Sequence, residues 1–383
     1  MGDSGGARAA WDNPAVTEPR GLRAAMTLEQ SWHRVPGGTA VAALSLARAL
    51  AARDDVEVVG VAARHRAPAP PPWSPPVPVR HLPLPRLALY ESWHYLRRPA
   101  VQLATGPVQV VHATTLALPP PRAPLVVTVH DLAWRRHPDM FTRWGVRFFE
   151  RGLALARADA TLILCSSRAT LGDCRTAGFD DARLRLVPLG VASPLAADAE
   201  IKRVRARYEL TRPYVLWTGT VEPRKNLRGL LRAFADLDHE IDLALAGPRG
   251  WNEDLEDLVS QVPDRVKVLG YVPQQDLAPL YKGAEVFCFP SLTEGFGLPV
   301  LEAMAQGTLV VTSKGTSTEE LGAGAAVLIE PADSDSIRAG LQRALNDQAL
   351  RRRLQAAGPR RAGAYTWERT ADLVVAAYRE AAS

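Results

Sequence analysis

The sequence is poor in cysteine and has no long apolar run. Its three cysteines, Cys165, Cys174 and Cys288, are widely spaced and form no CxxC pair, which excludes a disulfide scaffold and a structural zinc site. No apolar stretch reaches the roughly 18 residues needed to cross a bilayer. Residues 1–20 lack the apolar segment of a secretory signal. We therefore expect a cytoplasmic protein with a disordered N-terminal segment over residues 1–20.

Lysine is missing from the first half of the chain. Residues 1–192 carry 23 arginines and 15 acidic residues, a net charge of +8, whereas residues 193–383 carry 23 basic and 26 acidic residues, a net charge of −3. This difference in sign predicts that the two halves meet different partners. A basic half suits a phosphate-bearing acceptor or an anionic membrane surface. Zinc-finger spacings and RNA-recognition signatures are absent, so we expect no nucleic-acid partner.

Apolar strand-like runs alternate with helical patterns from Leu22 onwards, which predicts parallel sheets covered by helices. The strand candidates are Leu22–Met26, Val56–Val61, Val108–His112, Leu125–His130, Thr161–Cys165 and Arg185–Val187, then Tyr214–Trp217, Leu243–Ala246, Val266–Leu269, Val286–Phe289, Leu309–Val311 and Val327–Ile329. We expect a first helix at Thr39–Ala52, a proline-rich surface loop between Pro68 and Pro78, and a linker at Ala192–Ala199. The chain is thus predicted to form two doubly wound α/β domains, residues 21–192 and 193–362, with a ligand-binding cleft between them.

A glycine pair precedes the first predicted helix, in the segment Pro36-Gly37-Gly38-Thr39. Glycines there let a backbone approach a ligand closely, and a helix N-terminus attracts an anion such as a diphosphate. A plain tight turn explains the same residues equally well. The GxGxxG and Walker A motifs are missing, so nicotinamide cofactors and ATP hydrolysis lack their usual markers.

A second candidate loop, Thr218–Asn226, leads from a strand into a helix and contains Gly219. Two adjacent cations, Arg224 and Lys225, stand at the predicted helix start, where the helix dipole normally favours acids. An anionic ligand would compensate for this placement, each charge-assisted hydrogen bond contributing roughly 1.5–3 kcal/mol. A solvated surface pair is the alternative.

The segment Pro290–Met304 is the most specific signal. Pro299 suits the first turn of a helix, which would place Glu302 in that turn and Glu294 in the preceding loop. Gly295 and Gly297 leave backbone amides free to approach a ligand. The two carboxylates can hold two hydroxyl-bearing groups of one ligand, such as a sugar and a ribose. Alternatively, Glu302 only favours the helix N-terminus and Glu294 is an ordinary loop acid.

Two histidines end neighbouring predicted strands of the basic half. His130 lies at a strand's carboxyl end facing the expected cleft, and His112 ends the preceding strand in the same way. A structural histidine is the alternative for either one. Together they favour a substrate contact by at least one of them.

These segments together resemble the donor half of retaining glycosyltransferase family 4, whose members have the GT-B fold. The matching pieces are Gly219–Asn226, Leu245–Gly247, Val268–Val272 and Pro290–Gly307, in which Glu294 and Glu302 are separated by seven residues. Val35–Thr39, Val111–Thr114 and Val126–Trp134 extend the resemblance less specifically over the basic half. Several members carry Gly-Arg where this chain has Gly219-Thr220, so a phosphate-binding arginine is missing there and Arg224 is its candidate substitute.

The resemblance implies a nucleotide-sugar site. It places Arg224 and Lys225 on the donor diphosphate, Glu294 on the transferred sugar and Glu302 on the ribose hydroxyls. It also implies that the Gly37-Gly38 loop closes over the phosphates, that His130 lies near the reacting centre, and that a last helix over residues 363–383 crosses back onto the first domain. The candidate catalytic residues are His130, Glu294, Arg224 and Lys225. The candidate donor-binding residues are Gly37, Gly38, Gly219, Arg224, Lys225, Val272, Glu294, Gly295, Phe296, Gly297, Leu298 and Glu302.

The implied reaction moves a hexose from a nucleotide diphosphate to a glycan, lipid-linked or small-molecule acceptor with retention of configuration. In our interpretation Arg224, Lys225 and loop amides stabilise the leaving nucleoside diphosphate. Val111–Thr115 and Val129–Leu132 look most like bacterial mannosyltransferases that use GDP-mannose, with a UDP-sugar as the runner-up. No DxD pair stands out, because Asp333-Ser334-Asp335 reads as a helix cap, so we expect no required metal or further cofactor.

Two other functions need the same residues. A nucleotide-sugar 2-epimerase of similar fold would need a donor site without an acceptor groove, and the spacing of Glu294 and Glu302 argues against it. A non-catalytic sugar-nucleotide or polysaccharide-binding protein is the second alternative. The presence of Lys225, Glu294 and Glu302 counts against that function.

Two segments of the basic half, Tyr90–Arg98 and Trp144–Arg151, combine aromatic residues with arginine. Such helices can lie at a membrane interface, where each basic residue contributes about 1 kcal/mol. A core-facing aromatic stripe with solvated arginines is the alternative. We expect salt-sensitive peripheral contact with an anionic membrane, such as the inner face of the plasma membrane.

Overall fold

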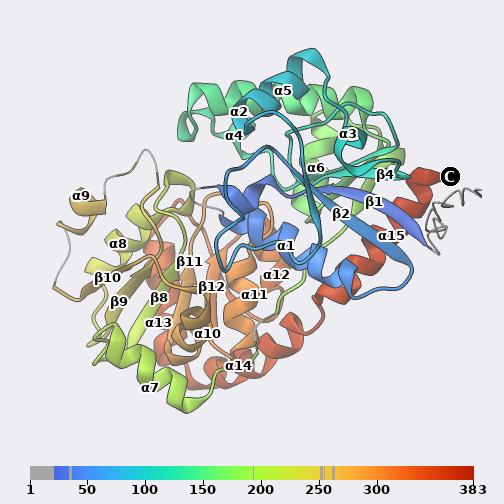
Figure 1. The fold of residues 1–383 in the computed structure, drawn as a ribbon. Coiled ribbons are helices and arrows are strands. Elements are labelled where there is room, and N and C mark those ends of the chain that lie inside the picture. Colours follow the sequence, from blue (N-terminus) through green and yellow to red (C-terminus); the bar gives the residue numbers. More distant parts are fainter. Residues whose placement is uncertain (1–20, 34–36, 193, 251–252, 254, 261–263) are drawn as a thin grey trace, which may run out of the picture.

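The computed structural model describes residues 21–33, 37–192, 194–250, 253, 255–260 and 264–383, and the segment 1–20 that we expect to be disordered lies outside them. Two parallel sheets, each covered by helices, form the described part of the chain (Figure 1).

The first sheet has seven parallel strands in the order β3-β2-β1-β4-β5-β6-β7. The strands are β1 (Leu22–Thr27), β2 (Val56–Ala62), β3 (Val79–His81), β4 (Val110–Ala113), β5 (Leu125–Val129), β6 (Leu162–Cys165) and β7 (Leu184–Leu186). The α-helices between them are α1 (Gly37–Ala51), α2 (Arg86–Glu91), α3 (Gln102–Thr105), α4 (Ala133–Arg136), α5 (Arg143–Asp159) and α6 (Arg168–Thr176). Short turns of other helix types are η1 (Glu29–Trp32), the π-helical η2 (Ser92–Leu96), η3 (Pro138–Met140) and η4 (Asp181–Arg183).

The second sheet has six parallel strands in the order β10-β9-β8-β11-β12-β13. The strands are β8 (Tyr214–Thr218), β9 (Asp242–Ala246), β10 (Val266–Gly270), β11 (Val286–Phe289), β12 (Leu309–Ser313) and β13 (Val327–Ile329). The helices are α7 (Asp198–Arg207), η5 (Pro223–Lys225), α8 (Leu227–Ala235), α9 (Leu255–Val259), α10 (Gln274–Gly283), α11 (Leu298–Ala305), α12 (Ser317–Gly322), α13 (Ser334–Asn346), α14 (Gln348–Ala362) and α15 (Trp367–Ala382).

Each sheet has one point at which the strand order reverses, between β1 and β4 in the first sheet and between β8 and β11 in the second. Ligands of doubly wound sheets bind outside the carboxyl ends of the strands at this point. The loops that follow β8 and β11 carry Lys225 and Glu294. The topology therefore places the two most specific sequence segments at the expected binding edge.

Burial in the core explains why the strand sequences are nearly continuous apolar runs. The strands β6 and β11 are buried at every residue, as expected when helices cover both faces of a parallel sheet. One buried cluster covers one face of the first sheet, and a second covers one face of the second sheet. The largest cluster includes residues of both sheets together with α1, α11 and α15, so the two halves share a continuous apolar interior.

The last helix returns to the first sheet. The helix α15 contacts α1, β1, β4 and β5, and Figure 1 shows it in red beside the blue strands. The Tyr378 hydroxyl lies 2.7 Å from His112 Nδ1, and Arg379 pairs with Asp55 at 2.6 Å. This is the crossing-back helix that the resemblance implies.

The predicted strands occur within two residues of their expected bounds, with one omission. The strand β3 was not predicted because it has only three residues, follows the proline-rich stretch and pairs only with the edge of β2. Residues 68–78 contain no helix or strand, as expected of a loop. The linker prediction extends too far, because α7 begins at Asp198 and the Glu200 carboxylate accepts a hydrogen bond from the Ala197 amide at 2.8 Å.

Candidate active site

The carboxyl ends of the two sheets meet at a glycine. The loop after β11 approaches the end of β5 so closely that a Cβ on Gly295 would lie 2.1 Å from the backbone oxygen of His130. The hydroxyls of Ser166 and Thr170 donate hydrogen bonds to the carbonyl oxygens of His130 and Gly295, at 2.9–3.3 Å. Only glycine fits so close a backbone contact. The need for Gly295 is thus explained by the contact between the sheets, and a contact of its amide with a ligand stays a prediction.

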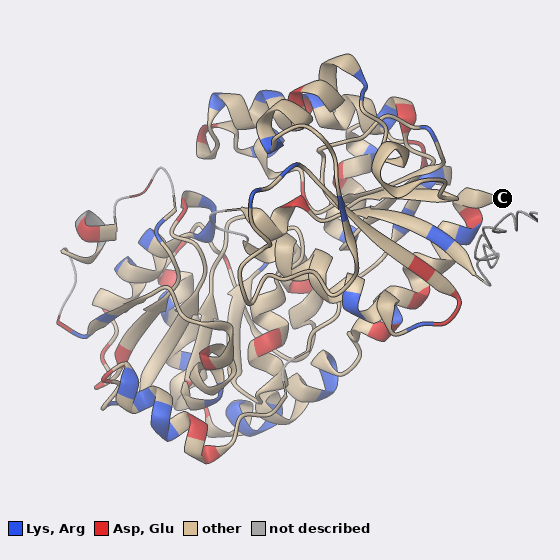
Figure 2. Ribbon diagram, viewed as in Figure 1, with Lys and Arg blue, Asp and Glu red and all other residues tan. Residues whose placement is uncertain are grey.

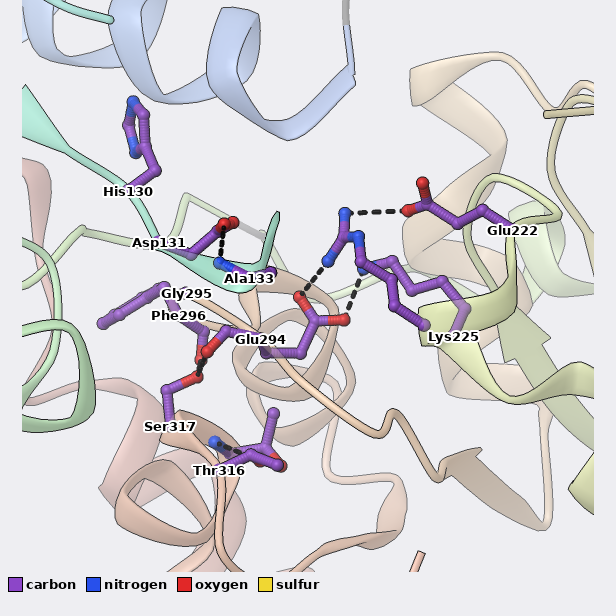
Figure 3. Close-up of polar contacts among 12 residues, drawn as sticks. His130, Asp131, Ala133, Glu222, Lys225, Glu294, Gly295, Phe296, Thr316 and Ser317 are labelled. Carbon is purple, nitrogen blue, oxygen red and sulfur yellow. Dashed lines mark hydrogen bonds and ion pairs between the residues drawn. The ribbon is translucent and has the colours of Figure 1, made fainter. Parts of the chain in front are cut away.

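Glu294 lies one residue before this contact and forms ion pairs with the loop after β8 (Figure 3). Lys225 Nζ donates to Glu294 Oε1 at 2.5 Å, and Arg224 Nη1 donates to Oε2 at 3.2 Å. Arg224 Nη2 also pairs with Glu222 Oε1 at 2.8 Å. The Lys225 side chain is only 11% exposed. The structure therefore brings together three of the predicted catalytic residues and excludes a solvated surface pair.

Burial and neighbouring charges shift the pKa values in this cluster. Burial alone would raise the pKa of Glu294, but Lys225 and Arg224 outweigh it and hold that pKa below its usual value. Burial, and then Arg224, lower the pKa of Lys225. Burial raises the pKa of Glu222, whose Oε2 has no hydrogen-bond partner within the described residues. Because buried charges are stable only when paired, an incoming anion has to compete with carboxylates for the two cations.

A short 3₁₀ helix positions the cations. The helix η5 begins at Pro223 and ends before Asn226, which has a φ of 53°. The Asn226 side chain accepts from the Gly229 amide at 3.2 Å and donates to the carbonyls of Pro290 and Pro331 at 3.1 and 2.6 Å, which fastens this loop to the loop after β11. Arg224 and Lys225 thus precede α8 rather than opening it. Glu294 and Glu222 supply the compensating negative charge.

Glu302 lies on α11 in the second helical turn. We expected the first turn, but the helix begins at Leu298, directly after Gly297, and holds no acidic residue in its first turn. The Tyr281 hydroxyl donates to Glu302 Oε2 at 3.0 Å and contacts Thr218 Oγ1 at 2.9 Å. Because Glu302 lies outside the first turn, it does not occupy the position where a carboxylate favours a helix N-terminus. Burial raises the pKa of Glu302.

A cavity of about 830 Å³ opens beside Glu302. Its wall includes Tyr281, the exposed Tyr271, and Pro72 of the proline-rich loop. Ligand pockets commonly have volumes of about 300–1,000 Å³, so this cavity has room for a nucleoside. The predicted donor-binding residue Val272 is buried between two residues of the wall, Tyr271 and Pro273.

The two histidines have different surroundings. His130 Nε2 lies 3.1 Å from the carbonyl of Thr114, which makes Nε2 the protonated nitrogen, and burial lowers the pKa of His130. Its imidazole is therefore neutral at pH 7. His112 is fully buried and contacts Tyr378 and Thr128 with its two ring nitrogens, at 2.7 and 2.8 Å. The structural alternative is thus correct for His112.

The remaining predicted residues lie in the same loops, but not all face the charge cluster. Gly219 directly follows β8, and Gly297 and Leu298 open α11. The Phe296 ring is buried against Tyr365, with ring centroids 6.0 Å apart, so it packs on the chain leading to α15. Gly37 and Gly38 begin α1 and are exposed, and Gly37 needs its glycine because its φ is +63°. Residues 34–36 of that loop lie outside the described part.

Three further residues belong to this site and were not selected from the sequence. Glu222 stands two residues before Arg224, but nothing in the sequence shows that its carboxylate is buried. Asp131 accepts a hydrogen bond from the Ala133 amide at 3.0 Å, and its charge helps to raise the pKa of Arg224 against the effect of burial. Tyr281 reaches Glu302 from α10, a contact that only the packing of α10 beside α11 creates.

The part of the chain that the structure describes offers neither a metal site nor a membrane span. No group of three or more His, Cys, Asp and Glu side chains there could hold a metal ion. No described helix is both long and apolar enough to span a membrane. Asp333 caps α13 by accepting from the Asp335 amide at 2.9 Å, as predicted for that segment.

Comparison with known proteins assigns the chain to a family. The profile described as Glycosyltransferase Family 4 matches residues 36–193, and the profile described as Glycosyl transferases group 1 matches residues 198–361. The chain is 34% identical over 304 residues to O-antigen chain mannosyltransferase B of Escherichia coli, covering 76% of this chain and 80% of that protein. It is 34% identical over 278 residues to MMP alpha-(1->4)-mannosyltransferase of Mycolicibacterium hassiacum, covering 67% of this chain and 66% of that protein.

Solved structures match the fold. Sucrose-phosphate synthase of Thermosynechococcus elongatus superposes with a TM-score of 0.77 at 23% identity, covering 94% of this chain and 98% of that one. Anabaena HepE in complex with UDP and glucose superposes with a TM-score of 0.72 at 18% identity, covering 94% of this chain and all of that one. The two sheets that meet at Gly295 agree with the fold of these structures. The profiles and the relatives show that the chain belongs to glycosyltransferase family 4, as a nucleotide-sugar glycosyltransferase of the GT-B fold.

Proposed function

We propose that the protein transfers mannose from GDP-mannose to a hydroxyl of a glycan, lipid-linked or small-molecule acceptor, with retention of configuration. Two relatives that match two thirds or more of this chain are both named mannosyltransferases. The observation that carries the proposal is the buried cluster of Lys225, Arg224 and Glu294, which lies in the loops after β8 and β11. The cavity is lined by Glu302 of α11, the helix that follows the Glu294 loop.

In this proposal the cation pair holds the donor diphosphate. Lys225 and Arg224 donate hydrogen bonds to the two carboxylate oxygens of Glu294. A diphosphate offers a similar pair of oxygens with more negative charge. Glu302 accepts hydrogen bonds from the ribose hydroxyls, and Tyr281 holds its carboxylate in place. The base then lies in the adjoining cavity near Tyr271. Glu294 accepts hydrogen bonds from the hexose.

The reaction follows from these positions. The bond between the anomeric carbon and the phosphate oxygen breaks, and its electron pair goes to the leaving diphosphate. Lys225 and Arg224 stabilise the charge that develops there. The acceptor hydroxyl attacks from the same face of the sugar, and its proton passes to the departing phosphate oxygen. The neutral imidazole of His130 lies near the hexose without adding a charge.

The direct test is a thermal-shift screen with nucleoside diphosphates and nucleotide sugars, combined with an assay of released nucleotide. GDP and GDP-mannose should raise the melting temperature, and GDP should be released when an acceptor is present. Protection by UDP but not GDP would overturn the donor assignment. Conversion of GDP-mannose to a 2-epimer without any acceptor would favour an epimerase.

A pair of variants tests the ribose assignment in the same screen. Glu302→Ala should remove protection by GDP, by guanosine and by GDP-mannose alike, because all three contain the ribose. Tyr281→Phe keeps the carboxylate but loses the hydrogen bond to it, so affinity should fall only about fivefold. Unchanged protection in Glu302→Ala would contradict the assignment.

A further inference from the structure

An exposed face of the first half combines aromatic and basic side chains. We define the basic–aromatic face as Tyr95 and Leu96 of η2 together with Arg143, Trp144, Arg147 and Arg151 of α5. Tyr95, Leu96 and Trp144 are 56%, 61% and 53% exposed. Large apolar side chains that remain this exposed in one region commonly mark an interaction surface.

The two helices hold this face as one surface. The Arg151 guanidinium lies 5.5 Å from the centre of the Tyr95 ring and donates two hydrogen bonds to the His94 carbonyl, at 3.0 and 3.1 Å. Phe148 stacks on Trp144 and on His94, with centroid distances of 5.3 and 4.5 Å. The helices α2 and α5 lie beside each other at the top of Figure 1. The alternative of a core-facing stripe thus holds for Phe148 but not for Trp144 and Tyr95.

The positive charge of the face is not neutralised. Arg143 and Arg147 are exposed and form no ion pair or hydrogen bond through their side chains within the described residues. Other arginines of the same half are paired, such as Arg53 with Asp55 and Arg135 with Glu150. Figure 2 shows the basic residues along these helices. The face therefore offers free cations beside exposed aromatic rings.

The spacing on α5 fits docking along a flat surface. Trp144, Arg147 and Arg151 are exposed at positions i, i+3 and i+7 and share one side of the helix, while Leu153 and Ala156 are buried. Tryptophan and tyrosine favour the interface between lipid and water, and arginine is attracted to anionic headgroups. A shallow helix face with this composition matches a bilayer surface better than a groove.

We propose that the basic–aromatic face docks the protein reversibly on an anionic lipid bilayer. The face follows the carboxyl ends of β3 and β5, because α2 comes after β3 and α5 is reached from His130 through α4 and η3. It therefore stands at the same edge of the first sheet as the candidate site. Delivery of an acceptor carried by the bilayer rests on the proposed function, whereas the docking itself does not.

The test is cosedimentation of the full chain with phosphatidylcholine vesicles, with and without phosphatidylglycerol, at about 50 and 500 mM salt. The wild type should sediment only with the anionic vesicles and only at low salt. Arg143→Glu/Arg147→Glu should lower the partition coefficient roughly tenfold or more. Tyr95→Ala/Trp144→Ala should lower it at least about threefold while leaving the charge unchanged.

The matched control is Arg352→Glu/Arg353→Glu on α14. It reverses the charge at two exposed arginines that also have no ion pair within the described residues. It should bind vesicles like the wild type, and all variants should keep the melting temperature and its shift with GDP. No binding of the wild type to anionic vesicles overturns the proposal. The proposal is also overturned if the α14 control loses as much vesicle binding as Arg143→Glu/Arg147→Glu. It is overturned likewise if the protein binds duplex DNA and Tyr95→Ala/Trp144→Ala binds vesicles like the wild type, because the surface would then be a general polyanion binder. Because vesicle binding needs no donor, either proposal can fail without the other.

Discussion

Lys225 and Arg224 share the carboxylate of Glu294 before any donor arrives. In the proposed function, a diphosphate would therefore replace one buried anion with another rather than fill an open pair of cations. Such replacement favours a ligand that carries more negative charge than a single carboxylate. At the scale of single residues, discrimination of nucleoside diphosphate from nucleoside should depend mainly on Lys225.

The first prediction concerns Lys225. Lys225→Met should weaken GDP binding roughly tenfold to a hundredfold, since a hydrogen bond to a charged group contributes about 1.5–3 kcal/mol. Guanosine binding should not change, because guanosine has no phosphate. Titration calorimetry with both ligands measures the difference. The control is Lys314→Met, which removes an exposed lysine paired with Glu330 at 3.0 Å. Equal losses for GDP and guanosine would remove Lys225 from the diphosphate.

The second prediction is a proton taken up at Glu222. Burial already raises the pKa of Glu222, one of its oxygens has no partner within the described residues, and a diphosphate beside Arg224 would raise the pKa further. Affinity for GDP-mannose should therefore increase as the pH falls towards this pKa, which lies above the ordinary value of about 4.5. The diphosphate of GDP-mannose has no group that titrates near neutral pH.

Calorimetry in two buffers of different ionisation enthalpy detects the uptake. Glu222→Gln has no carboxyl group to protonate and should show none. Identical binding heats in the two buffers for the wild type, or the same uptake in Glu222→Gln, would contradict the prediction.

Sequence patterns were sufficient to predict those site residues that a single segment identifies. Lys225 and Glu294 were predicted because each stands in a loop between a strand and a helix. Asp131, Glu222 and Tyr281 were missed because their role depends on burial and on packing between segments far apart in the sequence. For the same reason the pairing of Glu294 with Lys225 could not be predicted, although both residues were.

At the scale of elements, α15 is held to the first sheet by a buried histidine. The third prediction is that His112 makes stability fall with acid. Burial lowers the pKa of His112 to about 3, against an ordinary value of about 6.5, so the native state stays neutral while the unfolded state takes up a proton. The contribution of neutral His112 to the free energy of unfolding is fully present well above pH 6.5. Below pH 6.5 it falls by up to about 1.4 kcal/mol per pH unit.

Two variants separate this titration from the hydrogen bond. Between pH 7 and 5 the wild type should lose about 1–2 kcal/mol more stability than His112→Gln, measured by urea unfolding. Tyr378→Phe loses the 2.7 Å contact, at a cost of about 1 kcal/mol, but keeps the wild-type pH slope. An identical pH slope in His112→Gln and the wild type would show that His112 is protonated in the native state.

Element bounds could be predicted where periodicity and caps agree. The bounds of β11 and β13 match the prediction because β11 is a short apolar run between Glu285 and Pro290, and β13 is one that ends before Glu330. The first turn of α11 was misplaced because Pro299 can occupy either of the first two helical positions. The helix therefore begins one residue earlier than a proline at the first position would indicate.

At the scale of the whole molecule, the two sheets meet at the backbone of Gly295 and His130. The fourth prediction is that Gly295→Ala separates donor binding from transfer. The added Cβ would lie 2.1 Å from the His130 oxygen, so one sheet has to shift relative to the other. Lys225 and Glu302 both belong to the second sheet and its helices, so GDP affinity should stay within about threefold. Transfer should fall at least about tenfold, because it needs groups from both sheets.

Steady-state assays and calorimetry on the same preparation measure the two quantities. Gly297→Ala is the matched glycine variant, since Gly297 lies two residues away and its added Cβ would lie 2.7 Å from the Thr318 side chain rather than near His130. It should affect GDP binding and transfer together. Wild-type transfer by Gly295→Ala would show that the close approach of the sheets is not needed for the reaction.

The arrangement of two sheets was predictable because the pattern of strands and helices restarts after the linker. Their contact was not, because it depends on Ser166 and Thr170 reaching the Gly295 carbonyl across more than one hundred residues of sequence. The net charge of +8 in the first half likewise predicted a surface but not its position. That position requires knowing which arginines are paired.

The most direct test of mannosyl transfer at this site is proton NMR of GDP-mannose turnover by the wild type and Glu294→Gln. The wild type should release GDP and form a mannose product whose first anomeric signal is α, as in the donor. Glu294→Gln should still bind GDP, but its turnover should fall about a hundredfold or more, since the group that positions the hexose is neutralised. A β-configured first product, or undiminished turnover by Glu294→Gln, would contradict the account.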